Sequence, residues 1–362
     1  MPSETLEGLL IDRIRRDGPI DLATYMEECL GHPTLGYYTT QGSVGADGDF
    51  TTAPEISQLF GELIGLWTID LWQQAGTPND VVLLELGPGR GTLMADVLRV
   101  WSQVCGDTPP VHLVELSHRL REKQEKALSA ITTDITWHAT LDTAPQAFTI
   151  ALANEFFDAL PIRQYLKTET GWAERVINVS ATGALEPSER NSSAPDLLVP
   201  PNDLENAQPG DVIEVSPACE QAMAQLTATI SRQGGAALVI DYGYAAPALG
   251  DSFQALENAE FADPWANPGK ADLTAHVNFA NLAAVGKAAG LSATATIAQG
   301  AFLSALGIAQ RAAGLKKAAS ASQVREIDAA VGRLTSPQQM GDLFKVLAVY
   351  QGAQLSPAGF PA

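Results

Sequence analysis

Three glycines at two-residue spacing are the first residues whose types suggest chemistry. Gly87, Gly89 and Gly91 lie in the segment LLELGPGRGTL, directly after an apolar run that is typical of a buried strand. A dinucleotide fingerprint needs a glycine where Thr92 stands, and a phosphate-binding P-loop needs a lysine followed by serine or threonine. Because neither requirement is met, the loop favours a ligand without phosphate that approaches the backbone closely. The alternative is a purely structural turn.

Two carboxylates accompany this loop. Glu85 lies at the end of the first strand, where it can accept a hydrogen bond from an ammonium or hydroxyl group. Glu115 ends the next apolar run 24 positions after Gly91 (115 − 91), the placement of the acid that binds a ribose diol in nucleotide-binding sheets. Leu116 beside it can cover an adenine ring. An adenosine ligand with no phosphate and a cationic amino-acid tail is S-adenosylmethionine, so these residues predict a site for that methyl donor.

Three polar residues, Asn154, Glu155 and Asp158, follow the fourth predicted strand in the segment ALANEFFDALP. We expect them to face the methyl donor, because the ends of parallel strands meet at one edge of a sheet. Methyl transfer is an in-line displacement, so the protein mainly aligns the nucleophile and manages its proton. Two carboxylates suit a guanidinium, which bonds bidentately to one while the second holds or deprotonates it. Glu155 and Asp158 are therefore the candidate catalytic residues, and the alternative is that either acid caps the next helix.

Other kinds of site find little support in the sequence. The five histidines show no metal-binding spacing, and Asp47-Gly48-Asp49 lacks the bidentate acid of a calcium loop, since Gln58 stands at its twelfth position. We therefore expect no metal. No nucleophile elbow of the G-x-S-x-G type is present, which disfavours a hydrolase. Three scattered cysteines without CxxC spacing indicate neither a disulfide framework nor zinc, and predict a reducing compartment.

The elements that must position these residues alternate between strand and helix. Apolar runs at 81–87, 111–117, 135–138 and 148–156 are separated by helical patterns, which predicts an α/β fold with a doubly wound parallel sheet. Its ligand should lie at the carboxyl ends of the strands. Further predicted helices and strands lie at 4–16, 20–33, 55–75, 216–235, 236–244, 276–290, 302–334 and 343–352.

Two stretches interrupt this pattern. Residues 161–215 read as an insertion on the rim of the sheet, with alternating hairpin strands at 163–180 and a polar loop at 186–203. Residues 243–274 read as irregular.

Net charge sets limits on the partners. The formal charge is −20, so the field of the protein repels phosphate backbones and disfavours nucleic acid. No stretch approaches the 18 apolar residues of a membrane helix, and the first residues show no apolar signal region. We therefore expect a cytoplasmic protein without membrane insertion.

Several segments together resemble one known family. In order along the chain they are HPTLGYYTT, GDFTTAPEISQLFGE, LLELGPGRGTL, ANEFFDALPIRQY, VIDYGY, PGKADLTAHVNF and MGDLFKVLAV. They resemble the MidA family of S-adenosylmethionine-dependent methyltransferases, which is related to a mitochondrial complex I assembly factor that methylates an arginine of a complex I subunit. One segment departs from the family, because SFQALENAEFADP carries no histidine where we expect one.

The resemblance implies a class I methyltransferase core, which is Rossmann-like, and roles for individual residues. It places the donor-binding motif at Glu85, Gly87, Gly89 and Gly91, the ribose acid at Glu115, and the reacting end at Asn154 and Glu155. Thr52, in the segment GDFTTAPEIS, is the residue we expect to close over the methionine end of the donor.

These patterns divide the chain into four parts. They are an N-terminal helical region with the donor-closing loop (1–78), the first part of the core (79–160), the insertion as a candidate substrate platform (161–215) and the remainder of the core with inserted helices (216–362). The leading hypothesis is methylation of a protein arginine, with a complex I subunit as the candidate acceptor. The alternatives are a donor-binding assembly factor with little turnover, and methylation of a small molecule. The sequence does not predict an oligomeric state.

Overall fold

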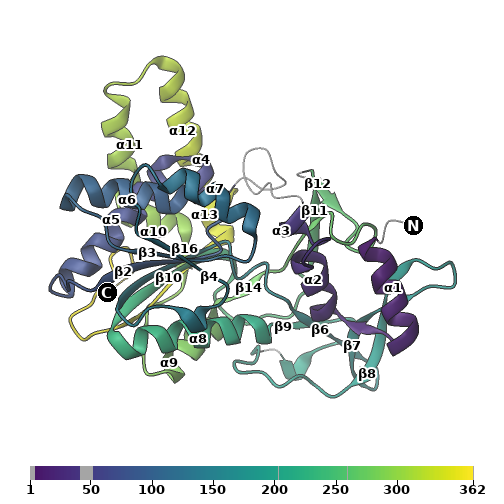
Figure 1. Ribbon diagram of the computed structural model, residues 1–362. Helices are drawn as coiled ribbons and strands as arrows, with labels where there is room; N and C mark the ends of the chain where they lie inside the picture. The colour runs from purple at the N-terminus through teal and green to yellow at the C-terminus, as the bar shows by residue number, and fades with distance from the viewer. Residues whose placement is uncertain (1–4, 41–51, 203, 259, 362) are drawn as a thin grey trace.

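The computed structural model describes residues 5–40, 52–202, 204–258 and 260–361, and Figure 1 shows them folded into two lobes. The larger lobe contains a nine-stranded sheet of main order β15-β17-β10-β5-β2-β3-β4. Within it β4, β3, β2, β5 and β10 are parallel to their neighbours, whereas β17 is antiparallel to β10. The strands are β2 (Val81–Leu86), β3 (Val111–Val114), β4 (Ile135–His138), β5 (Phe148–Asn154), β10 (Gly235–Tyr244), β14 (Val277–Asn278), β15 (Ser292–Ala293), β16 (Ile297–Ala298) and β17 (Phe344–Gln351).

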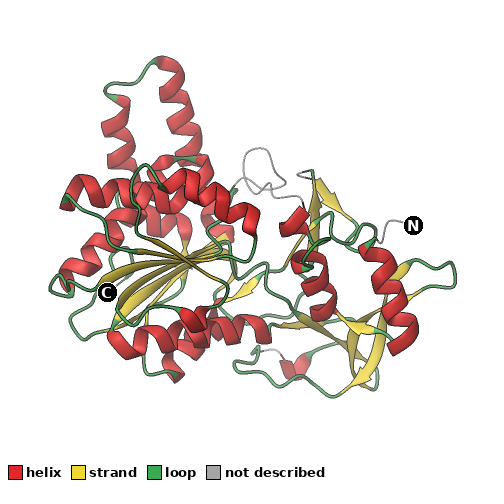
Figure 2. Cartoon of the chain, in the orientation of Figure 1, coloured by secondary structure: helices red, strands yellow, loops and turns green. Residues whose placement is uncertain are grey.

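Helices cover both faces of this sheet (Figure 2). One face packs on α5 (Gln58–Gln74), α6 (Thr92–Cys105) and α7 (His118–Leu128), and the other on α8 (Pro217–Gln233) and α9 (Phe279–Ala288). Successive strand residues alternate between the two faces, so Leu83 belongs to the core under α6 and Leu84 to the core over α8. The predicted doubly wound α/β fold is confirmed.

Two long predicted helices are each divided in the structure. The pattern at 55–75 yields α4 (Ala53–Ile56) and α5, because Ser57 adopts an extended conformation and its Oγ accepts a hydrogen bond from the Leu59 N–H at 3.2 Å. The pattern at 302–334 yields α10 (Gln299–Ala305), α11 (Ile308–Lys316) and α12 (Ala321–Thr335). Helices α11 and α12 form a hairpin that projects from the lobe, and α13 (Met340–Leu343) leads back into β17 (Figure 1).

The smaller lobe is built on a second sheet. Its main order is β1-β7-β6-β9, with β8 paired to β7, and all pairs are antiparallel. Its elements are α1 (Leu6–Asp17), β1 (Ile20–Asp21), α2 (Leu22–Gly31), α3 (Tyr37–Thr40), β6 (Arg163–Thr168), β7 (Gly171–Val179), β8 (Leu185–Ser192) and β9 (Val212–Val215). The hairpin predicted at 163–180 is confirmed, and it belongs to a sheet of its own. Short 3₁₀ turns occur at Leu141–Thr143 and Leu204–Asn206.

Two predictions about this lobe are wrong. The start of the supposed polar loop at 186–203 is strand β8, whose polar residues and Pro187 suit an edge strand that faces water. The supposed irregular stretch at 243–274 contains β11 (Gln254–Glu257), β12 (Glu260–Ala262) and β13 (Asp272–Thr274), which form a three-stranded sheet. These strands are only three or four residues long, too short to show a clear alternation of polar and apolar residues.

The core of the smaller lobe combines three distant parts of the chain. Leu10 and Tyr25 from the N-terminal helices pack with Ile177 from the insertion and Leu273 from β13. This core therefore brings residues near 38 and 272 beside the end of the central sheet, although they are far apart in sequence.

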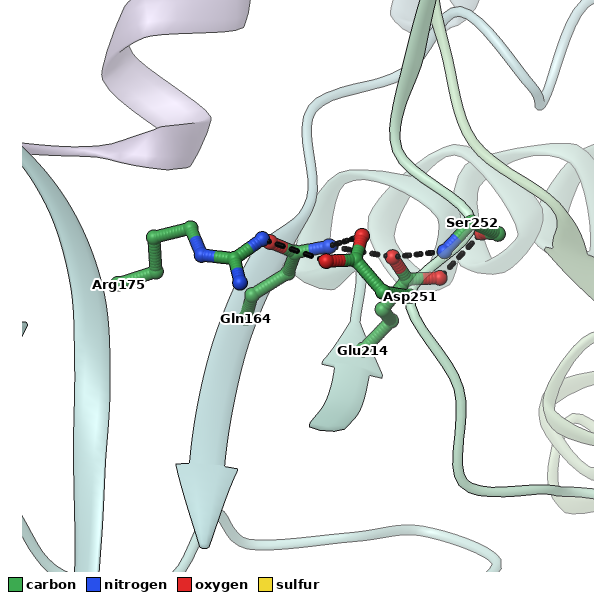
Figure 3. Close-up of polar contacts among 5 residues, drawn as sticks. All are labelled: Gln164, Arg175, Glu214, Asp251 and Ser252. Atoms are coloured by element: carbon green, nitrogen blue, oxygen red, sulfur yellow. Dashed lines mark hydrogen bonds and ion pairs between the residues drawn. The ribbon is translucent and has the colours of Figure 1, made fainter. Parts of the chain in front are cut away.

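A polar network joins the insertion to the segment that enters β11 (Figure 3). The Arg175 guanidinium and the Gln164 amide both donate to the Asp251 carboxylate, each at 2.7 Å. Gln164 also donates to Glu214 at 2.6 Å, and Glu214 accepts from the Ser252 N–H at 2.9 Å. The Ser252 hydroxyl in turn accepts from the His276 N–H at 2.9 Å, so the network holds the segment around residue 276 against the second sheet.

No helix in the described ranges is long and apolar enough to span a membrane.

Candidate active site

The glycine loop leaves a bare backbone at the end of β2. Gly87, Gly89 and Gly91 all have positive φ, at 60°, 53° and 80°, a region that side chains other than glycine rarely adopt. A Cβ atom at Gly87 would lie 2.8 Å from Cδ2 of Phe156. The loop then enters α6 through Gly91, so the first amides of that helix face the same edge of the sheet.

Glu85 supplies a buried carboxyl next to this loop. It is 3% exposed, and its Oε2 atom has no hydrogen-bond partner among the described residues. Burial raises the pKa of the Glu85 carboxyl to about 8. A buried acceptor without a partner beside a bare backbone fits a ligand that brings its own N–H or O–H donor.

Glu115 is connected to the glycine loop through one side chain. The Gln124 amide donates to the Gly89 carbonyl at 2.9 Å and to Oε2 of Glu115 at 3.2 Å, while its oxygen accepts from the Trp137 ring N–H at 2.8 Å. Oε1 of Glu115 accepts from the Ser117 N–H at 2.8 Å, and burial raises the pKa of this carboxyl. The structure therefore brings the predicted ribose acid and the loop together. Gln124, fully buried on α7, was not predicted.

Two predicted donor-site residues have fewer contacts. The Leu116 side chain is 75% exposed and follows Glu115 directly. Thr52 lies at the N-terminus of α4 and makes no capping hydrogen bond with its side chain. The residues before Thr52 in the predicted closing segment lie outside the described residues, as does Asp47-Gly48-Asp49.

Asn154 and Glu155 meet the residue after Thr52. Oε1 of Glu155 accepts from the Ala53 N–H and from the Asn154 amide, both at 3.0 Å, whereas Oε2 has no hydrogen-bond partner among the described residues. Burial raises the pKa of Glu155 to about 8, and the charge of Asp158 adds to this rise. Oδ1 of Asn154 is also buried and accepts no hydrogen bond from the described residues. Glu155 has a φ of 52°, a strained conformation that is often found at functional sites.

Asp158 lies beside a second acid that the sequence analysis did not assign. Asp241 in β10 is fully buried, and its Oδ2 atom accepts from the Asp158 N–H at 3.2 Å. Burial raises the pKa of Asp158. Burial also raises the pKa of Asp241 well above its ordinary value, and the negative charges of Asp158 and Glu155 add to that rise. Among the described residues, Oδ1 of Asp158 has no hydrogen-bond partner within 3.5 Å, although the nearby Tyr242 hydroxyl stabilises the charged form of this carboxyl and so lowers its pKa.

The smaller lobe adds a fourth acid, Asp272, to Glu155, Asp158 and Asp241. The Tyr38 hydroxyl donates to Oδ1 of Asp272 at 3.0 Å, and the Ala275 N–H donates to the Asp158 carbonyl at 3.0 Å. Burial raises the pKa of Tyr38, and the charges of Asp272 and Asp158 add to this. We call Glu155, Asp158, Asp241 and Asp272 the acidic cluster.

Two members of the acidic cluster were missed in the sequence, for different reasons. An acid inside the apolar strand VIDYGY is costly to bury, and this signal could have identified Asp241. Tyr38 and Asp272 are 234 positions apart and have no comparable signal.

The charge of the cluster suits a cationic ligand. Among the described residues, no lysine or arginine pairs within 4.0 Å with Glu155, Asp158 or Asp241. A guanidinium or ammonium group would relieve the repulsion between these carboxylates and donate to the free oxygens. In the described part of the chain, no three His, Cys, Asp or Glu side chains are arranged to hold a metal ion.

Sequence comparisons identify relatives with a stated activity. A family model described as an S-adenosyl-L-methionine-dependent methyltransferase matches residues 63–297. The mitochondrial protein arginine methyltransferase NDUFAF7 of Danio rerio is 36% identical over 96% of this chain and 87% of its own length. The human NDUFAF7 is 35% identical over 94% of this chain and 82% of its own length.

Solved structures show the same architecture. A protein from Burkholderia thailandensis, described as a methyl transferase and bound to S-adenosyl-homocysteine, superposes with a TM-score of 0.82 at 27% identity. The match covers 99% of this chain and 92% of that chain. A native structure from the same organism gives a TM-score of 0.83 at 26% identity, over 98% and 94% of the two chains.

The predicted location is wrong. The absence of an apolar signal region led us to expect a cytoplasmic protein, whereas the NDUFAF7 relatives are named as mitochondrial proteins. A search for an apolar signal region does not detect this difference, because mitochondrial transit peptides are amphipathic.

Proposed function

Because the chain belongs to the MidA family of S-adenosyl-L-methionine-dependent methyltransferases, we propose that it transfers a methyl group from that donor to an arginine side chain of a protein. The relatives named protein arginine methyltransferases support this acceptor. The observation that carries the proposal is the pair Glu155 and Asp158 after β5, each of which has one carboxylate oxygen that accepts no hydrogen bond within 3.5 Å from the described residues.

The donor side is formed by the glycine loop and its two acids. We assign the donor ammonium to Glu85, whose Oε2 atom has no hydrogen-bond partner in the described part of the chain, and the ribose diol to Glu115. Gly87, Gly89 and Gly91 keep the backbone bare where the donor approaches, with Asn154, Thr52 and Leu116 at its edges. When bound, S-adenosylmethionine supplies a methyl group on a positively charged sulfur.

The acceptor side is formed by the acidic cluster. We assign the guanidinium to Oε2 of Glu155 and Oδ1 of Asp158, which have no hydrogen-bond partner among the described residues. These carboxylates would fix the plane of the guanidinium and turn one nitrogen toward the donor side. A guanidinium nitrogen that gains a methyl group must lose one proton, and a carboxylate with a raised pKa is suited to take it.

The acceptor protein that we favour is a subunit of respiratory complex I, as the family resemblance implies. An overall charge of −20 is compatible with a basic segment as the docking partner.

The first experiment measures methyl transfer to protein and the dependence of its rate on pH. We expect purified protein to transfer label from labelled S-adenosylmethionine into one arginine of a proteome from a complex I-bearing bacterium, identified by mass spectrometry. For a peptide around that arginine, kcat/KM should rise with pH up to about 8, because Glu155 must be ionised to bind and deprotonate the guanidinium. Glu155→Gln should lose about 100-fold or more in kcat/KM, together with this pH step.

The matched control is Glu220→Gln. Glu220 lies on α8, outside the acidic cluster, and accepts a hydrogen bond from the Asn281 amide at 3.2 Å. Burial raises the pKa of this carboxyl as well. The control should keep native transfer. Unchanged transfer by Glu155→Gln, or label on a residue other than arginine, contradicts the proposal; donor binding without any transfer would favour an assembly factor.

A further inference from the structure

Asp241 holds the turn that follows Glu155 by its backbone. Its Oδ2 atom accepts from three consecutive N–H groups, those of Phe156, Phe157 and Asp158, at 3.2, 3.0 and 3.2 Å. Its Oδ1 atom accepts from the Tyr242 N–H at 2.9 Å. Both oxygens are therefore engaged with backbone, and Asp241 itself is fully buried.

The turn held in this way carries residues of both sides of the site. It begins at Glu155, whose positive φ requires support from its surroundings. Cδ2 of the Phe156 ring lies 2.8 Å from the position that a Cβ at Gly87 would take, so the ring packs against the donor loop. Asp158 ends the turn within the acidic cluster. A shift of this turn would displace the donor loop and the acceptor acids together.

The cost of burying Asp241 indicates that its position matters. It stands in the strand VIDYGY between the apolar Ile240 and the largely apolar Tyr242, and its neighbours Asp158 and Glu155 repel its charge. An apolar residue would be cheaper to bury in such a strand. Only a side chain with two acceptor oxygens and no donor satisfies the three N–H groups of the turn and the Tyr242 N–H together.

We propose that Asp241 is a positioning residue that fixes the turn 155–158 and thereby aligns the donor loop with the acceptor acids. The acceptor half of this proposal rests on the proposed function, whereas the donor half requires only donor binding.

The test is Asp241→Asn, with Glu174→Gln as the matched control. In asparagine an N–H₂ group replaces one of the two oxygens that accept from backbone N–H groups. Two donors would then face each other, so the turn must move. Glu174 is also a buried carboxylate with several donors, but it accepts from Arg163 and Arg190 in the second sheet. We expect Asp241→Asn to weaken S-adenosylhomocysteine binding about tenfold by calorimetry, and to lower kcat about 100-fold with a smaller change in acceptor KM. Glu174→Gln should lose thermal stability and keep both values.

Phe156→Leu tests the same path without altering the Asp241 hydrogen bonds, which are made to backbone. It should weaken S-adenosylhomocysteine binding about threefold and leave acceptor KM unchanged, and it remains informative if Asp241→Asn does not fold. Native donor affinity in Phe156→Leu, or native kcat in a folded Asp241→Asn, would overturn the proposal. Failure to find an arginine acceptor would refute the proposed function alone, because the calorimetric result would still stand.

Discussion

The proposed donor side and the proposed acceptor side of the site are built in opposite ways. On the donor side, Glu85, the glycine loop, Glu115 and Gln124 all come from one strand-helix-strand-helix segment of about 40 residues (124 − 85). On the acceptor side, Tyr38, Asp158, Asp241 and Asp272 come from four segments and from both lobes. The two sides meet at the turn after β5, where Phe156 lies against Gly87 and Asn154 donates to Glu155.

This difference decides what each side depends on. A contiguous unit fixes its geometry through standard strand and helix connections, so the donor side depends on local backbone conformation. The acceptor side depends on how the second lobe packs on the first, because β13 and α3 bring in Asp272 and Tyr38. Changes on the donor side should therefore have large effects on donor affinity, and changes between the lobes should affect the acceptor.

The largest effect is expected for Gly87→Ala. The new Cβ would lie 2.8 Å from the Phe156 ring at a φ of 60°, so the loop or the ring must move. We expect S-adenosylhomocysteine affinity to fall by about 100-fold or more in calorimetry. Gly106→Ala is the control, since Gly106 also has positive φ, at 80°, but a Cβ there meets nothing within 4 Å. Equal losses in both variants would show that backbone strain alone, and not the closeness of Phe156, explains the effect.

A smaller effect is expected for Glu85→Gln. Burial raises the pKa of Glu85 to about 8 in the folded protein. The contribution of this group to the free energy of unfolding is therefore complete at pH values below its ordinary pKa, and it is lost as the pH rises through about 8. Glutamine resembles the protonated form, so the variant should exceed the native protein in stability by a few kcal/mol at pH 8 and by less at pH 6. Urea unfolding at both pH values measures this, and donor affinity should fall about tenfold.

The control for this prediction is Glu122→Gln, on the exposed face of α7, where the side chain is 60% exposed. A stability difference that does not grow with pH would contradict the role given to burial of Glu85.

The same difference explains how much could be predicted from the sequence. Gly87, Glu85 and Glu115 could be proposed from the sequence because their spacing lies within one unit whose geometry is known in advance. Glu155 and Asp158 could be proposed because they follow a strand of the same sheet. Asp272 and Tyr38 could not be found, because no local pattern reports that β13 and α3 pack side by side.

Prediction of the secondary structure from the sequence had a similar limit. Continuous apolar runs identified the central strands, since burial on both faces leaves a strong signal. Strand β8 was missed because an exposed edge strand has the composition of a loop. The break at Ser57 was missed because the apolar pattern continues across it, and only the capping geometry reveals it.

The smallest effect, and the sharpest test of the comparison, is expected for Asp251→Asn in the network that joins the insertion to the segment entering β11 (Figure 3). The change weakens the bonds from Arg175 and Gln164, which should reduce stability by about 1 kcal/mol or less because the carboxylate is partly exposed. The network holds the segment that includes His276, and the neighbouring Ala275 N–H contacts Asp158, so acceptor KM should rise about two- to threefold. Donor affinity should not change, because no donor-side residue touches the network. A fall in donor affinity equal to the rise in acceptor KM would show that the lobes act as one unit and that the two sides are not separable.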